Sequence, residues 1–147
     1  MSPSVPDSPM FDAVVVGAGP AGIATALALH HVGAKVALAG PPPLDKAPAR
    51  PVTRTAALFT SSVDFLKRLG VWERLEPDAA PLTAIRIVDA SRSLLRSPDI
   101  AFESRELGLA CFGFNIANAA LNTVLYDQAR AVLPHLAPET VDAVEPG

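Results

Sequence analysis

The sequence predicts an α/β fold built on a βαβ unit, and three stretches near the N-terminus support this prediction. Residues 11–16 form a short β-branched apolar run that ends in glycine, which is typical of a strand buried on both faces of a parallel sheet. Residues 20–32 are rich in Ala and Leu, and residues 35–39 form a second apolar run. A strand, a helix and a strand in this order predict a crossover whose two strands are parallel neighbours.

The first helix of this unit has recognisable ends. Pro20 stands where the first turn of a helix tolerates proline, and Gly33 stands where a helix stops. After the second strand, prolines occur at residues 41–43, 48 and 51. This stretch is expected to be a loop, because proline has no N–H group to donate within a helix or a central strand.

Further elements are expected in the middle of the chain. Ser61 or Ser62 is expected to cap a helix that ends at Gly70. Its apolar positions at helical spacing are Val63, Leu66 and Leu69. Trp72 and Leu75 are expected to continue in a short helical turn.

A hairpin is expected next, followed by a helix and a last strand. Residues 84–89 alternate like a half-exposed strand, with residues 94–96 as the hairpin partner. Residues 118–133 are expected to form a helix that Pro134 ends, and residues 140–144 a strand. The apolar side of that helix consists of Leu121, Val124, Leu125, Ala129 and Val132.

Length, composition and charge limit the possible classes of protein. The chain has 147 residues, of which 50% are hydrophobic, so one compact domain over residues 11–147 is expected. The net charge of −3 comes without a dense run of Lys or Arg, which excludes a nucleic-acid binder. No uninterrupted run of about 18 apolar residues predicts a transmembrane helix. Residues 1–10 hold three prolines and no basic residue, so they are expected to be a disordered lead-in rather than a signal peptide.

The reactive side chains are few and scattered. Cys111 is the only cysteine, which rules out an internal disulfide, is consistent with a reducing compartment and predicts a buried thiol. His30, His31 and His135 have no partners at metal-ligand or triad spacing, so surface or packing roles are expected. No metal site and no catalytic side chain is therefore expected. Carboxylates such as Glu103 and Glu106 are expected to solvate a loop.

Residues 17–22 read G-A-G-P-A-G, which is a G-x-G-x-x-G motif between the first strand and the first helix. Gly17 permits the tight turn, Gly19 lets a diphosphate approach the backbone, and Gly22 lets the helix pack closely on the sheet. The N–H groups of the first helical turn have no intrahelical acceptors and lie at the positive end of the helix dipole. The motif therefore predicts a Rossmann-like site for a dinucleotide.

The motif continues further, to Ala26 and Gly33, which makes a tight turn without a ligand the less favoured interpretation. A P-loop is excluded because no Lys with Ser or Thr follows the second glycine. NAD and FAD remain as ligands, and both predict an acidic residue at the end of the second strand to hold the ribose. Gly40 stands there instead, and Asp45 follows in the proline-rich loop. The ribose contact is left unassigned.

The motif, together with residues 54–58 (RTAAL), 69–72 (LGVW), Phe112-Gly113 and Asn118, resembles the ubiquinone-biosynthesis hydroxylase family. These are FAD-dependent aromatic-ring monooxygenases of the p-hydroxybenzoate hydroxylase fold. The resemblance implies a Rossmann-like βαβ FAD-binding unit with part of an inserted β-rich substrate region. Family members are typically more than twice as long, and two motifs expected downstream are absent. The chain stops where the third parallel strand would lie, so the fold is expected to be truncated.

The resemblance implies FAD as cofactor, NAD(P)H as co-substrate and O2 as oxidant, with the chemistry residing in the cofactor. It also implies a small aromatic, lipid-like substrate and a cytoplasmic location. Peripheral association with a membrane is the alternative location. Arg54 is assigned a flavin contact, with a solvated loop charge as the alternative, and Asn118 lies near the flavin. The cofactor-binding residues expected are Gly17, Gly19, Pro20, Ala21, Gly22, Arg54 and Asn118.

Three functional hypotheses follow. The first is the N-terminal FAD-binding segment of a flavin-dependent monooxygenase. The second is a nucleotide-binding fragment without activity of its own, because a sheet that lacks later strands leaves an edge and apolar surface uncovered. The third is a small NAD-dependent protein, which Arg54 and residues 69–72 disfavour.

Overall fold

The computed structural model describes residues 9–43, 54–91 and 98–145, and the chain divides into two compact units. Unit 1 comprises Met1–Arg50 and Asn122–Gly147, and unit 2 comprises Pro51–Leu121. Unit 2 is therefore inserted in the sequence of unit 1. The expected lead-in lies outside the described residues except for its last two.

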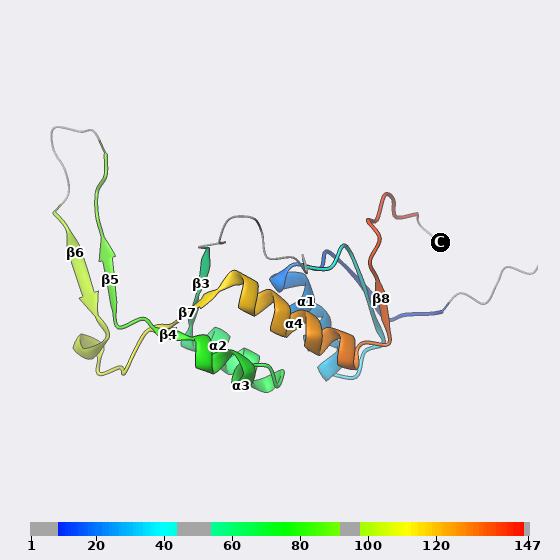
Figure 1. Cartoon of the computed structure of the whole chain (residues 1–147), viewed down its shortest axis with the longest axis horizontal. Coiled ribbons are helices and arrows are strands. Elements are labelled where there is room, and N and C mark those ends of the chain that lie inside the picture. The colour runs from blue at the N-terminus through cyan, green and yellow to red at the C-terminus, as the bar shows by residue number, and fades with distance from the viewer. Residues whose placement is uncertain (1–8, 44–53, 92–97, 146–147) are drawn as a thin grey trace, which may run out of the picture. The chain divides into compact units, whose positions relative to one another are not determined.

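Unit 1 contains a parallel three-stranded sheet and the first helix (Figure 1). The strands are β1 (Ala13–Val16), β2 (Val36–Ala39) and β8 (His135–Ala137), in the order β1-β2-β8. Helix α1 (Pro20–His31) connects β1 to β2, with Pro20 in its first turn. The predicted α/β fold with a βαβ unit is confirmed.

The two strands of the βαβ unit differ in burial. All of β2 is buried, because β2 lies in the centre of the sheet. In β1, by contrast, Val14 is 59% exposed and Val16 is 57% exposed. The prediction that the first strand is buried on both faces was wrong, because no described segment covers the face of β1 that carries Val14 and Val16. Ala26 of α1 is fully buried, as expected of a small residue that packs closely.

The third parallel strand lies earlier in the chain than predicted. Residues 140–144 are not a strand; β8 forms at His135–Ala137 and pairs in parallel with β2, with Leu38 opposite Leu136. β8 directly follows the last helix, and Pro138, which lacks an N–H donor, ends it. The expectation that the chain stops where the third strand would lie was therefore wrong.

Unit 2 contains an antiparallel three-stranded sheet. Its strands are β3 (Thr55–Phe59), β7 (Gly113–Ala117) and β4 (Ala80–Pro81), in the order β3-β7-β4. Thr55 pairs with Ala117, so the beginning of β3 lies beside the end of β7.

Short helices follow β3. Helix α2 (Thr60–Arg68) buries Val63 and Leu66 and is followed by Gly70 with φ of 68°. Its N-cap is Phe59, without a side-chain hydrogen bond, so the predicted caps Ser61 and Ser62 were wrong: both lie inside the helix. Helix α3 (Trp72–Leu75) leads into a 3₁₀ turn, η1 (Glu76–Asp78). Trp72 is buried, with its ring centroid 5.2 Å from that of Phe114.

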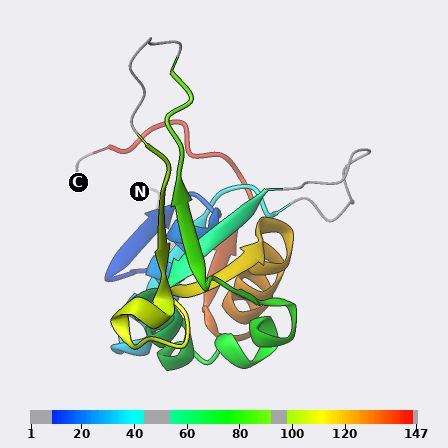
Figure 2. The same ribbon diagram turned by 90° about the vertical axis from the view of Figure 1, so that its left-hand side faces the viewer.

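A two-stranded ribbon projects from the β3-β7-β4 sheet, and Figures 1 and 2 show its strands side by side. It consists of β5 (Ala84–Ile87) and β6 (Ile100–Glu103), which are antiparallel. The predicted strand at 84–89 is confirmed in its first four residues. Its partner is β6, whereas the partner predicted at 94–96 lies outside the described residues.

The segment after β6 is more ordered than a solvated loop. Ser104–Leu107 form a 3₁₀ helix, η2, and Glu103 and Glu106 form its capping box. The main-chain N–H of Glu103 donates to Oε2 of Glu106 at 3.5 Å. Glu103 and Glu106 therefore have a structural role, which corrects the expectation that they solvate a loop.

The last helix, α4 (Asn118–Val132), has nearly the predicted bounds. Leu121, Leu125 and Ala129 are buried, whereas Val124 and Val132 are half-buried. Leu133, just past the helix, is buried as well. Among the described residues, no helix combines the length and the apolar character that crossing a bilayer requires.

Candidate cofactor-binding site

The chain leaves β1 through a sharp turn at Gly17. Gly17 has φ of 112°, a conformation that residues with a side chain rarely adopt. Its N–H donates to the carbonyl of Ala39 at 2.7 Å, which ties the turn to the end of β2. The turn therefore lies at the carboxyl edge of the parallel sheet, where open α/β sheets bind their ligands.

Gly19 is the N-cap of α1, and neither its conformation nor its packing requires glycine. Its φ of −81° and ψ of 173° are open to any residue. A Cβ atom on Gly19 would meet no atom of the described residues within 4 Å. The backbone is thus bare beside open space at the start of a helix, as the approach of a diphosphate requires.

The first turn of α1 supplies hydrogen-bond donors. Pro20 occupies its beginning, and the first main-chain bond of the helix runs from the N–H of Ile23 to the carbonyl of Gly19 at 2.9 Å. The N–H groups of Ala21 and Gly22 precede this bond and have no intrahelical acceptor. The first turn contains no acidic residue, so nothing in it neutralises the positive end of the helix dipole.

Gly22 is required by a close contact. A Cβ atom there would lie 1.9 Å from the carbonyl oxygen of Gly17 and 3.7 Å from Cγ1 of Val15. The third glycine therefore packs α1 mainly against the turn itself, and only secondarily against β1. This explains why the helix start and the Gly17 turn form one compact loop.

The two remaining predicted residues belong to unit 2, where the structure brings them together. The main-chain N–H of Asn118 donates to the carbonyl of Arg54 at 3.0 Å. This bond lies next to the pairing of Thr55 with Ala117, so Arg54 precedes β3 where Asn118 begins α4. Arg54 is exposed and Asn118 is half-buried. Asp45, the alternative ribose contact, lies outside the described residues.

Asn122 is a residue that the sequence pattern did not single out. Its Oδ1 is buried and accepts no hydrogen bond within the described part of the chain. Asn122 lies one helical turn after Asn118, so the two side chains project from the same side of α4. A buried acceptor without a donor is rare in folded proteins, which makes Asn122 a candidate for a bond to a bound group.

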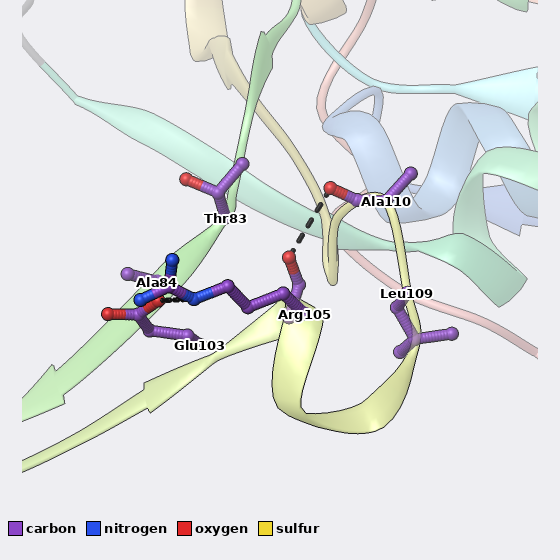
Figure 3. A pocket seen from close by; sticks show the side chains of 7 residues that line it. Thr83, Ala84, Glu103, Arg105, Leu109 and Ala110 are labelled. Atoms are coloured by element: carbon purple, nitrogen blue, oxygen red, sulfur yellow. Dashed lines mark hydrogen bonds and ion pairs between the residues drawn. The ribbon is translucent and has the colours of Figure 1, made fainter.

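A concave region lies in unit 2, beneath the β5-β6 ribbon (Figure 3). Its volume is about 430 Å³. The side chain of Arg105 forms an ion pair with Glu103, and the hydroxyl of Ser104 donates to the carbonyl of Ala110 at 3.3 Å. The residues that line it are Thr83, Ala84, Glu103, Ser104, Arg105, Leu109 and Ala110. The polar side chains of Glu103, Ser104 and Arg105 are thus bonded to other groups of the same lining.

The other reactive side chains show no site geometry. Cys111 is half-buried, which corrects the expectation of a buried thiol, since the loop before β7 leaves it partly open. His135 lies in β8 with its ring 5.2 Å from that of Phe11, which is a packing role. In residues 9–43, 54–91 and 98–145, no group of three or more His, Cys, Asp or Glu side chains is arranged to hold a metal ion.

These residues fit the diphosphate of FAD. The open space at Gly19 and the unpaired N–H groups of the first turn match a negatively charged group that needs close backbone approach. Gly19 needs neither a special φ nor room for a described neighbour, so the open space beside it supports the close approach of a ligand.

Comparisons with known proteins identify the family of the chain. Residues 10–142 match the family model described as the FAD-binding domain. The chain is 30% identical, over 118 residues, to a ubiquinone hydroxylase of Neisseria meningitidis serogroup C. This match covers 79% of the chain and 26% of that protein, so the chain spans about a quarter of the relative's length.

Solved structures show the same fold at low identity. The anhydrotetracycline hydroxylase of Streptomyces rimosus has a TM-score of 0.65 and 19% identity, over 93% of this chain and 26% of that one. The p-nitrophenol 4-monooxygenase of Pseudomonas putida has a TM-score of 0.64 and 16% identity, over 92% of this chain and 33% of that one. The family match spans nearly the whole chain, and the chain therefore belongs to the FAD-binding domain family, with FAD as its cofactor.

Proposed function

We propose that the chain is the FAD-binding portion of a flavin-dependent monooxygenase that hydroxylates an aromatic ring, in ubiquinone biosynthesis. The observation that carries the proposal is Gly19, a bare helix N-cap beside open space that nothing in the fold requires to be glycine. The family match supports FAD, and the ubiquinone hydroxylase relative supports the reaction class. The names of the structural neighbours, a hydroxylase and a monooxygenase, agree with this class.

In this proposal the chain's own residues bind and orient the cofactor. Gly17, Gly19 and Gly22 shape the turn, and the N–H groups of Ala21 and Gly22, after Pro20, hold the diphosphate. Arg54 and Asn118 contact the flavin, and the main-chain hydrogen bond that holds these two residues next to each other supports this assignment. Bound FAD supplies the redox chemistry, with NAD(P)H as reductant and O2 as oxidant.

A second candidate function is a nucleotide-binding unit without activity of its own. It is favoured by the uncovered side of β1, where Val14 and Val16 are more than half exposed. β1 is also one of the two edge strands of its sheet within the described residues. An uncovered apolar side and a free strand edge are typical of a surface that further protein covers.

A titration of the purified chain with FAD, FMN and NADH distinguishes these possibilities. We expect FAD to bind with a one-to-one visible flavin spectrum and FMN to bind far more weakly, because FMN lacks the adenosine monophosphate half of FAD and so has no diphosphate. NADH oxidation that depends on an aromatic substrate would support the monooxygenase. FAD binding without such oxidation would support the second candidate, and NADH binding without flavin uptake would contradict both.

We also propose a lipid-like aromatic substrate and a peripheral contact with membranes. The name of the ubiquinone hydroxylase relative supports this proposal, because ubiquinone is a lipid. Co-sedimentation with phospholipid vesicles, with and without a ubiquinone precursor in the bilayer, tests it. Equal amounts of protein in the pellet with and without vesicles would contradict membrane contact.

A further inference from the structure

We propose that Gly40 is a positioning residue of the diphosphate site. Its missing side chain lets the end of β2 lie against the Gly17-Ala18 turn and holds that turn in the shape that receives the diphosphate. This inference rests on the proposed binding of FAD. It concerns the position at the end of β2 where dinucleotide-binding sheets ordinarily place an acidic residue.

The contact between Gly40 and the turn is a contact between backbones. A Cβ atom on Gly40 would lie 2.9 Å from the amide nitrogen of Ala18. It would lie 3.2 Å from Cα and 3.4 Å from the carbonyl carbon of Gly17. Backbone atoms cannot rotate aside as the end of a side chain can. Any residue other than glycine therefore pushes the turn away from its position.

The conformation of Gly40 is fixed on the sheet side as well. Its φ is 141°, in a region that residues with a Cβ atom rarely adopt. Its N–H donates to the carbonyl of Ala137 in β8 at 2.8 Å, while the preceding Ala39 accepts the N–H of Gly17 at 2.7 Å. Gly40 thus lies between the third strand and the turn, and it cannot move from one without loosening the other.

A carboxylate at position 40 should therefore have the opposite effect on affinity from the one it has in other dinucleotide sites. In other dinucleotide sites a carboxylate at this place strengthens binding through the ribose hydroxyls. Here a carboxylate requires a Cβ atom where the Ala18 amide lies, so it displaces the turn that binds the diphosphate. We therefore expect Gly40→Glu to weaken FAD binding rather than strengthen it.

Two variants of Gly40 test the inference, Gly40→Ala and Gly40→Glu. Gly33→Ala is the matched control. Gly33 also has a positive φ, 92°, but an added Cβ would meet no described atom within 4 Å, and Gly33 lies at the opposite end of α1. Gly33→Ala therefore introduces backbone strain without touching the turn. In fluorescence titrations with FAD and with ADP, we expect Gly40→Ala and Gly40→Glu to raise Kd by about tenfold or more, and Gly33→Ala by less than about twofold.

A readout without ligand separates failure of this inference from failure of the proposed function. In amide NMR spectra of the free protein, Gly40→Ala should shift the Gly17 and Ala18 signals, whereas Gly33→Ala should leave them in place. Unshifted Gly17 and Ala18 signals, or a Gly40→Glu variant that binds FAD as tightly as the original chain, would overturn the role of Gly40. If the original chain binds neither FAD nor ADP, the proposed function is overturned, whatever the NMR spectra show.

Discussion

The glycine turn of unit 1 and the hollow beneath the β5-β6 ribbon of unit 2 are two candidate binding regions that differ in their hydrogen bonds. Around Gly19 the backbone is bare and the first N–H groups of α1 have no intrahelical acceptor. In the hollow, Arg105 pairs with Glu103, and Ser104 bonds to Ala110. The main-chain donors of α1 that have no intrahelical acceptor therefore favour the glycine turn, rather than the hollow, as the site of an anionic ligand.

The largest expected effect is on stability, at Gly22. Gly22→Ala places a Cβ atom 1.9 Å from the carbonyl oxygen of Gly17, so the turn and the helix must separate. We expect the free energy of unfolding to fall by about 3 kcal/mol, the upper part of the range for overpacking. Urea denaturation measures the change. Gly19→Ala is the control, expected to stay within about 1 kcal/mol because its Cβ enters open space.

The next effect is on binding, at Gly19. Gly19→Val leaves the fold intact but fills the space beside the helix start, where we place the diphosphate. The Kd for FAD should rise about 100-fold, which corresponds to about 2.7 kcal/mol. Flavin fluorescence measures the affinity, and a thermal melt checks the fold. Unchanged FAD uptake by a folded Gly19→Val variant would contradict the site.

A smaller effect is expected in the hollow, at Ser104. Ser104→Ala leaves the carbonyl of Ala110 without its donor and should lower the free energy of unfolding by about 1 kcal/mol. The Kd for FAD should not change. The matched control is Ser61→Ala, since Ser61 is exposed within α2 and makes no cap bond. A control that lost as much stability as Ser104→Ala would restore Ser61 as the cap of α2.

The smallest effect concerns the ion pair of Arg105 with Glu103. Both side chains are solvent-accessible, at 82% and 40%, so Arg105→Ala should cost about 0.5 kcal/mol or less. The loss should decline further in 1 M salt, which screens exposed charges. Unfolding curves at low and high salt measure it. A weaker affinity for FAD in Arg105→Ala would break the comparison, because it would make the hollow part of the cofactor site.

The βαβ unit could be predicted because its signals are local. A β-branched run, a helix between Pro20 and Gly33, and a second apolar run each show in a few neighbouring residues. β8 could not be predicted from the sequence, since it has only three residues and none of them is β-branched. Its strand conformation depends on the free edge of β2. Residues 140–144 have the better local pattern but no partner strand in the described part of the chain.

The residues of the candidate site also divide into those that the sequence indicates and those that only the structure indicates. Gly17, Gly19 and Gly22 could be proposed as site residues from the sequence because the turn, the open backbone and the close packing are requirements of one short loop. The role of Gly40 could not be proposed from the sequence, because it depends on the end of β2 lying against Ala18, which no sequence spacing reveals. Asn122 was missed as well, since a buried oxygen without a donor is visible only in the structure.

The insertion of unit 2 between the two stretches of unit 1 bears on the order of folding. β2 pairs with β8 across the whole of unit 2, and closing so long a loop opposes folding through lost chain entropy. Within unit 2, however, the bond from Asn118 to Arg54 and the pairing of β3 with β7 bring its two ends together. If unit 2 folds first, it brings its two ends together. The loop that must still close between β2 and β8 is then shorter than the whole intervening chain.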